Sequence, residues 1–191
     1  MTYYHYPLDY KEEDSTRSEG YLEYAEVYKN AIKILLKEYT SHRPLHDYCL
    51  APVLCLLRQY IELQLKGIIL YNECDAHKTI EGHNIVKLYE MAQKKTGNSY
   101  ECPKPNDEVT KFIDSLGRFD PKGQAFRYPE TLKGEDFFSG TDPWLRKKIM
   151  SIPDLNDVAE KVFADLEGLE GYLDFMKESE EEYFDYLNNL R

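Results

Sequence analysis

Several motifs that mark common enzyme classes are missing from the sequence. It contains no GxxxxGK[ST] phosphate-binding loop, no GxGxxG dinucleotide-binding motif and no GxSxG nucleophile motif. Its four cysteines include no CxxC pair, which favours free thiols in a reducing compartment. The first residues, MTYYHYPLDYKEED, lack the apolar stretch of a secretory signal peptide, so we expect a cytoplasmic protein.

Basic charge and long apolar runs are also scarce. The formal net charge of −11 argues against a protein that coats nucleic acid with a general basic surface. The acids gather at one end: residues 154–191 hold twelve acids and three bases, so residues 1–153 are nearly neutral and could form a local basic pocket. The longest apolar run, around residues 50–71, contains three charged side chains, so no membrane contact is expected.

A metal site is not expected either. Cys74, Asp75, His77 and His83 lie close together in the sequence. Their spacing, Cys-Asp-x-His followed by five residues and a histidine, matches no common zinc-binding pattern. The sequence therefore predicts neither a metal nor a cofactor.

Helical periodicity dominates the sequence. Apolar residues recur every three to four positions in several long segments, a pattern typical of amphipathic helices. The segment at 47–72 is apolar on nearly every side, so it is predicted to be the central helix of the core. We expect helices at about 18–40 with Ser18 as N-cap, at 47–72, at 84–95, at 107–116 with Asn106 as N-cap, within 144–150, and from Ser151 onward.

The pattern predicts a mainly all-α protein, an up-and-down helical bundle of about five helices with a short extended or hairpin insertion near 120–140. Glycine, proline and aromatic residues cluster in this insertion, where 125–132 and 135–138 are expected to pair as a hairpin. The expected organisation is an irregular arm at 1–17, a single bundle at 18–178 that includes the insertion at 117–150, and an acidic end at 179–191. The last helix either breaks near Ser179 or continues through residues 180–191.

Three charged residues form one stripe on the predicted central helix. Arg58, Glu62 and Lys66 are spaced four residues apart, so at about 100° per residue they lie within roughly 80° of the helix surface, with Gln59 beside them. One interpretation is a thin solvent-facing seam of ion pairs, each worth about 0.3–0.5 kcal/mol. The other is a stripe that faces an internal cleft and holds an arginine ready for phosphate or carboxylate, which its planar fork binds at two points.

A histidine precedes the helix expected at 84–95. Gly82 allows a turn before His83 and Asn84, and the start of a helix presents unpaired N–H groups that favour anions. His83 could act as an acid or a base near neutral pH. The alternative is a histidine that only caps the helix or packs against it.

An arginine lies between two aromatic residues in the insertion. Pro129 favours an extended conformation at Tyr128, and in an extended chain Phe126 and Tyr128 would point to one side and Arg127 to the other. The aromatic side chains would then anchor the segment to the bundle and hold Arg127 over a neighbouring surface. The alternative is a surface ion pair of Arg127 with Glu130 or Asp120.

Three segments together resemble the HEPN superfamily of helical-bundle proteins: CLLRQYIELQLKGII, GHNIVKLYE and DPKGQAFRYP. The resemblance covers roughly residues 45–130 and is closest to uncharacterised bacterial HEPN-like proteins of similar length. It implies an up-and-down bundle of four or five helices, a homodimer, and RNA as a candidate substrate. Many members are metal-independent endoribonucleases of toxin–antitoxin, phage-defence and CRISPR systems, in which paired subunits bring two Arg-x4-6-His motifs together. No arginine here precedes a histidine at that spacing, so no catalytic residue is transferred by motif.

The resulting hypothesis is a HEPN-like bacterial protein of a defence, toxin–antitoxin or stress module that binds or cleaves RNA, or binds nucleotides, through a polar cleft. If it is an enzyme, we expect a metal-independent endoribonuclease. A second hypothesis is a catalytically inactive interaction protein, like an antitoxin or immunity protein, that contacts a basic partner through its acidic C-terminal helix. A third is a purely structural stripe. The candidate catalytic residues are His83, Arg127 and Arg58, and the candidate ligand-binding residues are Glu62, Lys66, Tyr128 and Gln59.

Overall fold

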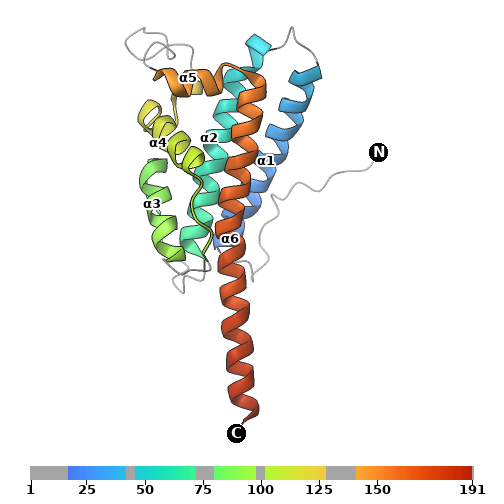
Figure 1. The fold of residues 1–191 in the computed structure, drawn as a ribbon, viewed down its shortest axis with the longest axis vertical. Coiled ribbons are helices and arrows are strands. Elements are labelled where there is room, and N and C mark those ends of the chain that lie inside the picture. The colour runs from blue at the N-terminus through green and yellow to red at the C-terminus, as the bar shows by residue number, and fades with distance from the viewer. Residues whose placement is uncertain (1–16, 42–45, 72–79, 98–101, 128–140, 191) are drawn as a thin grey trace.

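The computed structural model of the protein describes residues 17–41, 46–71, 80–97, 102–127 and 141–190. In these parts the chain forms α-helices and one short 3-10 helix and no β-strand, which confirms the all-α bundle (Figure 1). The helices are α1 (Arg17–Ser41), α2 (His46–Leu70), α3 (Ile85–Thr96), α4 (Asp107–Phe119), the 3-10 helix η2 (Ala125–Arg127), α5 (Pro143–Ile149) and α6 (Ile152–Asn189).

Helix α2 is the centre of the core, as predicted. It contacts α1, α3, α6 and η2, and α1, α2 and α6 run side by side while α3 and α4 cover the other flank (Figure 1). Its apolar side chains are fully buried over most of its length, because neighbours surround it on nearly every side. None of the helices in the described ranges combines the length and the apolar character that crossing a membrane requires.

Two of the three predicted N-caps are confirmed. Asn106 accepts hydrogen bonds from the backbone of α4, and Ser151 accepts one from the Asp154 N–H at the start of α6. Ser18, in contrast, is not an N-cap. It lies inside α1, is buried, and donates to the carbonyl of Gly67 at 2.9 Å, so it joins α1 to α2 instead.

Helix α6 does not break near Ser179, so of the two predicted alternatives the continuous helix is confirmed. It continues to Asn189, and Ser179 donates its hydroxyl to the Phe175 carbonyl at 2.8 Å, a bond that the helical backbone accommodates. The buried residues of α6 end at Leu173, and the helix then projects beyond the bundle (Figure 1). The acidic end is therefore the exposed continuation of a core helix.

The insertion begins with a helical turn. Residues 125–127 form η2, so the extended conformation predicted for them is wrong, and the alternation of side chains argued from it does not apply. Phe126 is nevertheless buried and Arg127 exposed, because successive side chains of a 3-10 helix also point in different directions. The rest of the predicted hairpin lies outside the described residues.

Candidate functional site

A pocket of about 420 Å³ opens between α2, the segment before α3, and the turn that links α4 to η2. It brings together residues that are distant in sequence and that were predicted separately, on the charged stripe, before the helix at 84–95 and in the insertion. These are Arg58, Gln59, Glu62, His83 and Arg127. The other lining residues are Cys55, Asp120, Lys122, Gly123, Gln124 and Phe126.

Glu62 is the hub of the site. Its Oε2 accepts from Arg58 Nη1 at 3.1 Å, and its Oε1 lies 2.9 Å from Lys66 Nζ and 2.8 Å from His83 Nδ1. Arg58, Glu62 and Lys66 are 3%, 4% and 8% exposed, so the solvent-facing seam is wrong. Burial alone would raise the pKa of Glu62, but the bonds from Lys66 and His83 and the nearby cations outweigh it and hold the pKa below its ordinary value.

Arg58 is held from two sides and still keeps one donor unpaired. Its Nη1 binds Glu62, and its Nη2 donates to the backbone carbonyl of His83. Its Nε has no acceptor among the residues that the structure describes. A buried donor without a partner costs about 1–3 kcal/mol, so an acceptor supplied by a ligand would remove a standing penalty. Burial lowers the pKa of Arg58, and the charges of Glu62 and Asp120 oppose this.

His83 reaches the pocket with an exposed ring and one fixed nitrogen. Its side chain is 64% exposed, and Nδ1 faces the Glu62 carboxylate. A neutral imidazole that donates from Nδ1 keeps an unprotonated Nε2, the form that a general base needs. Asn84 is the N-cap of α3, and Gly82 has a φ of 91°, so capping by His83 is wrong and the glycine provides the predicted turn.

The turn after α4 supplies the second arginine. Asp120 is buried at the C-cap of α4 and accepts from the Gln124 backbone at 2.7 Å, which fixes the turn. Phe126 packs against Phe119 with ring centroids 5.5 Å apart. Arg127 is left at the pocket without an ion pair to any residue in the described ranges. Its predicted alternative pair with Asp120 is not formed, and Glu130 lies outside those ranges.

The pocket is slightly basic in an acidic protein. Three lysine or arginine side chains and two carboxylates line it, which gives one net positive charge when the histidine is neutral. Cys55 also lines it, and burial raises the pKa of this thiol although Arg127 opposes the shift, so the thiol stays protonated. The sequence reasoning missed Cys55, Asp120 and Lys122. The Asp-Pro-Lys-Gly turn was the available signal for the last two.

Two predicted site residues do not line the pocket as described. Lys66 is buried against Glu62 and acts on the pocket only through that carboxylate. Tyr128 lies outside the described residues, as do Cys74, Asp75 and His77. Within those that are described, no group of three or more histidines, cysteines and acids is arranged to hold a metal ion.

Comparison with known proteins adds no assignment to this geometry. No protein-family model, no curated protein and no solved structure matches the chain.

Proposed function

We propose that this protein is a HEPN-like endoribonuclease that binds phosphate groups of RNA in the pocket and cleaves the backbone without a metal ion, in a bacterial defence, toxin–antitoxin or stress module. One observation carries the proposal: a histidine oriented by a buried glutamate shares a pocket with two arginines, one of which has a buried donor without an acceptor among the described residues. Such a set offers proton transfer and charge stabilisation at one phosphate.

The reaction that fits these groups is transesterification within RNA. His83 Nε2 takes the proton of a ribose 2′-hydroxyl, and the oxygen attacks the adjacent phosphorus. The bond from phosphorus to the 5′-oxygen breaks, and the imidazolium returns its proton to that oxygen. The products are a 2′,3′-cyclic phosphate and a 5′-hydroxyl, with no water consumed.

The other residues have separate roles in this reaction. Arg58 and Arg127 stabilise the negative charge on the pentacoordinate phosphate, for which arginine's fixed donors are suited. Glu62 holds the Nδ1 proton of His83 and stabilises the imidazolium, as carboxylates do in other histidine-dependent sites. Lys66 shares the charge of Glu62 and so tunes this support.

The protein's net charge limits how much RNA the site can hold. A chain with a net charge of −11 repels a polyanion outside the pocket. We therefore expect contact with only one or two phosphates, and binding that weakens with salt by roughly 0.7 log units per decade and per phosphate for single strands. A steeper dependence would require basic contacts outside this pocket.

The test is cleavage of transfer RNA and total RNA by the purified protein in the presence of EDTA. We expect cutting by the wild type, a loss of at least about 100-fold in Arg127→Ala and His83→Asn, and 5′-hydroxyl ends on the fragments. Arg118→Ala is the matched control, because Arg118 is an exposed arginine that pairs with Asp114 at 2.7 Å on α4.

The opposite result would refute the nuclease. A folded wild type that leaves RNA intact, or variants that cut as well as the wild type, would contradict the proposal. The first of these results would favour the non-catalytic interaction protein, whose acidic contact surface would be the exposed end of α6.

A further inference from the structure

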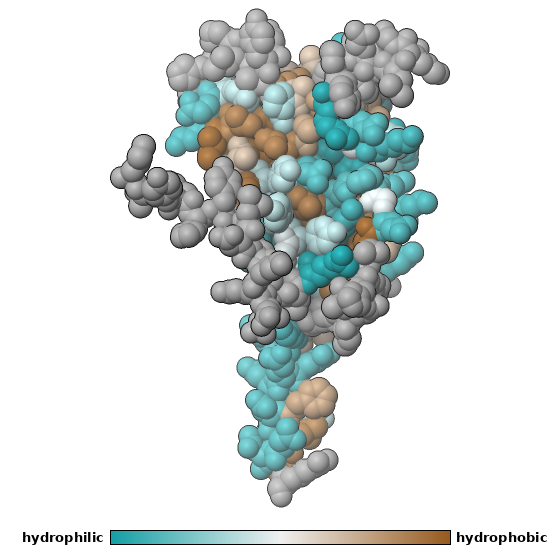
Figure 2. All heavy atoms as spheres, turned by 180° about the vertical axis from the view of Figure 1, so that it is seen from behind, coloured by the Kyte–Doolittle hydropathy of each residue, from teal (hydrophilic) through white to brown (hydrophobic). Residues whose placement is uncertain are grey.

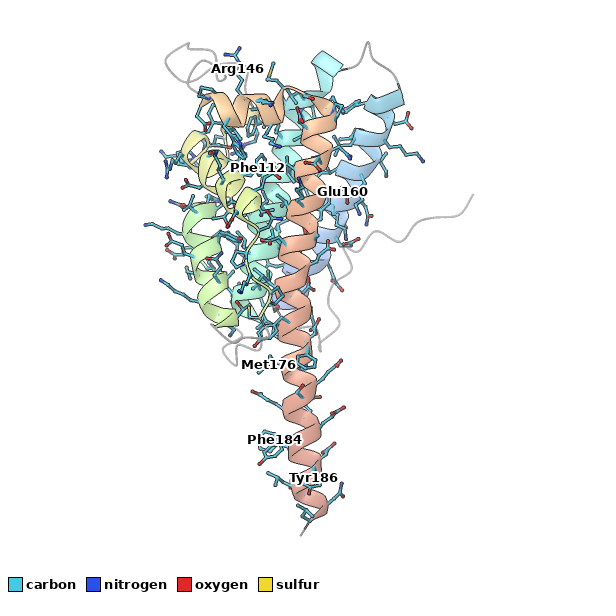
Figure 3. The ribbon with its side chains drawn as sticks, in the orientation of Figure 1. Phe112, Arg146, Glu160, Met176, Phe184 and Tyr186 are labelled. Atoms are coloured by element: carbon cyan, nitrogen blue, oxygen red, sulfur yellow. The ribbon has the colours of Figure 1, made fainter. Side chains whose placement is uncertain are left out.

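The end of α6 carries an exposed apolar face. Residues 174–189 continue the helix for about 24 Å beyond its last buried residue, at 1.5 Å per residue. Figure 3 shows Phe184 and Tyr186 on this projecting part, away from the bundle, and Met176 nearer to the bundle. Tyr183, Phe184, Tyr186 and Leu190 are 60%, 63%, 61% and 65% exposed, and Leu187 is 38% exposed.

This face continues the heptad pattern that packs α6 into the bundle. Along the whole helix one set of positions alternates steps of three and four residues, which is the spacing of a coiled coil. In the bundle these positions are all buried: Ile152, Leu155, Ala159, Val162, Leu166, Leu169 and Leu173. The pattern then continues through five positions that we term the α6 seam: Met176, Glu180, Tyr183, Leu187 and Leu190.

Apart from Glu180, the acidic residues of this segment lie away from the seam. At about 100° per residue, Glu178, Glu181, Glu182 and Asp185 lie roughly 120° or more from its centre. The positions that flank the seam are mostly uncharged, with Phe184 on one side and Tyr186 on the other. Figure 2 shows the same division, with brown side chains on one side of the projecting end and teal on the other. Exposed apolar stripes of this kind mark contact surfaces.

We propose that the α6 seam pairs with the seam of a second copy of this chain, as an antiparallel two-helix contact. A basic partner would be recognised by acids at the flanks of the seam, where coiled coils place their interhelical ion pairs. Here the flanks are aromatic and the acids other than Glu180 point outward, so two copies meet mainly through apolar side chains while those acids stay apart.

Glu180 decides the orientation. In a parallel pair it would face Glu180 of the second copy, two like charges in an apolar contact. In an antiparallel pair centred between positions 180 and 183, Glu180 lies beside Tyr183 of the second copy, whose hydroxyl can donate to the carboxylate. The same register sets Met176 beside Leu187 of the second copy. A single polar position inside an apolar seam fixes alignment in this way in coiled coils.

The contact is weak and strengthens with salt. An aromatic side chain buries about 150–250 Å², so the three rings, each about 60% exposed, offer roughly 300–450 Å² per copy. That is below the roughly 800 Å² per partner of a standard interface even when the leucines are added. Residues 174–190 hold six acids and one base, so the two segments repel one another until salt screens them.

Sedimentation of the full chain over a range of concentrations, at low and at high salt, tests the proposal. We expect a reversible dimer that tightens with salt, that Leu187→Ser weakens at least 10-fold, and that Tyr183→Phe weakens by less. Phe175→Ser is the matched control, since Phe175 is 52% exposed on the same helix but lies off the seam. Exposed positions are changed throughout, so folding is not at risk.

Three results would overturn the proposal. One is a monomer at every concentration and salt, and another is a dimer that Leu187→Ser leaves intact. The third is a monomer that binds a synthetic lysine-rich heptad peptide and loses this binding in Leu187→Ser and at high salt. That result would assign the seam to a basic partner.

Discussion

Replacing Glu62 by glutamine removes the anion that three positive or proton-donating groups share. Arg58, Lys66 and His83 all direct a nitrogen at its carboxylate. Glutamine keeps the shape of the side chain and one acceptor oxygen. Its second oxygen is replaced by an NH₂ group, whose hydrogens point at a cation. The buried Arg58 and Lys66 then lose their counter-charge without gaining access to water.

The expected cost is large for a change of one atom. Removing one partner of a buried ion pair costs about 3–5 kcal/mol, because the remaining charge stays buried and unpaired. For a chain of this length each kcal/mol lowers the melting temperature by about 2–4 °C, so the melting point should fall by roughly 6–20 °C. Urea unfolding followed by circular dichroism gives the free energy directly.

Two variants control this measurement. Glu181→Gln makes the same chemical change on the exposed end of α6 and should shift stability by less than about 0.5 kcal/mol. Adding Lys66→Met to Glu62→Gln removes one of the stranded cations, so the double variant should be more stable than the sum of the single changes by about 0.5–3 kcal/mol. A loss below 0.5 kcal/mol in Glu62→Gln itself would refute the view that this carboxylate holds the buried cations.

The pH dependence follows from the same carboxylate. The pKa of Glu62 in the folded protein lies below its ordinary value. The contribution of Glu62 to the free energy of unfolding is therefore complete above the unfolded pKa of about 4.3, and it is lost as the pH falls through the folded-state pKa. The difference in the free energy of unfolding between the wild type and Glu62→Gln should therefore shrink in acid. Burial raises the pKa of Asp165 and of Glu170, which acts in the opposite direction, but both proteins share those groups and the difference cancels them.

Two further predictions concern packing. Gly67→Ala places a Cβ 2.5 Å from Leu22 Cδ2 where α1 crosses α2, so the free energy of unfolding should fall by about 1–3 kcal/mol. The Cβ of Gly20→Ala meets no atom within 4 Å, so the free energy of unfolding of this variant should rise by up to about 1 kcal/mol. Phe126→Ala removes the buried ring that anchors η2. RNA cleavage should therefore fall nearly as far as in Arg127→Ala, while the helical signal in far-UV circular dichroism is kept. Unchanged cleavage would show that Phe126 does not position the arginine.

The sequence predicts the helices well because each one leaves a local signature. The apolar period, the Asn106 and Ser151 caps and the stripe of Arg58, Glu62 and Lys66 are all properties of neighbouring residues on one helix. The period could not show whether the stripe faces solvent, since that depends on which helices surround α2. Its burial became clear only from the packed bundle.

The pocket itself depends on contacts between distant segments, and these leave no local pattern. The bond between Glu62 and His83 spans 21 positions, and nothing near either residue specifies it. The error at Ser18 has the same origin, because its hydroxyl binds the Gly67 carbonyl 49 residues away instead of capping its own helix. The sequence alone left open whether the last helix breaks near Ser179, and the helix continues there because glutamate is a good helix former.

The bond from Arg58 to the His83 carbonyl has a consequence for fluctuations. Segments between helices usually open locally at a small free-energy cost, independently of the core. Here the guanidinium that holds the backbone of His83 is anchored on the most buried helix by Glu62. Opening residues 80–84 strips a buried cation of its partners, so the amides of these residues should exchange with solvent slowly. The position of the imidazole is thereby tied to the unfolding of the whole bundle.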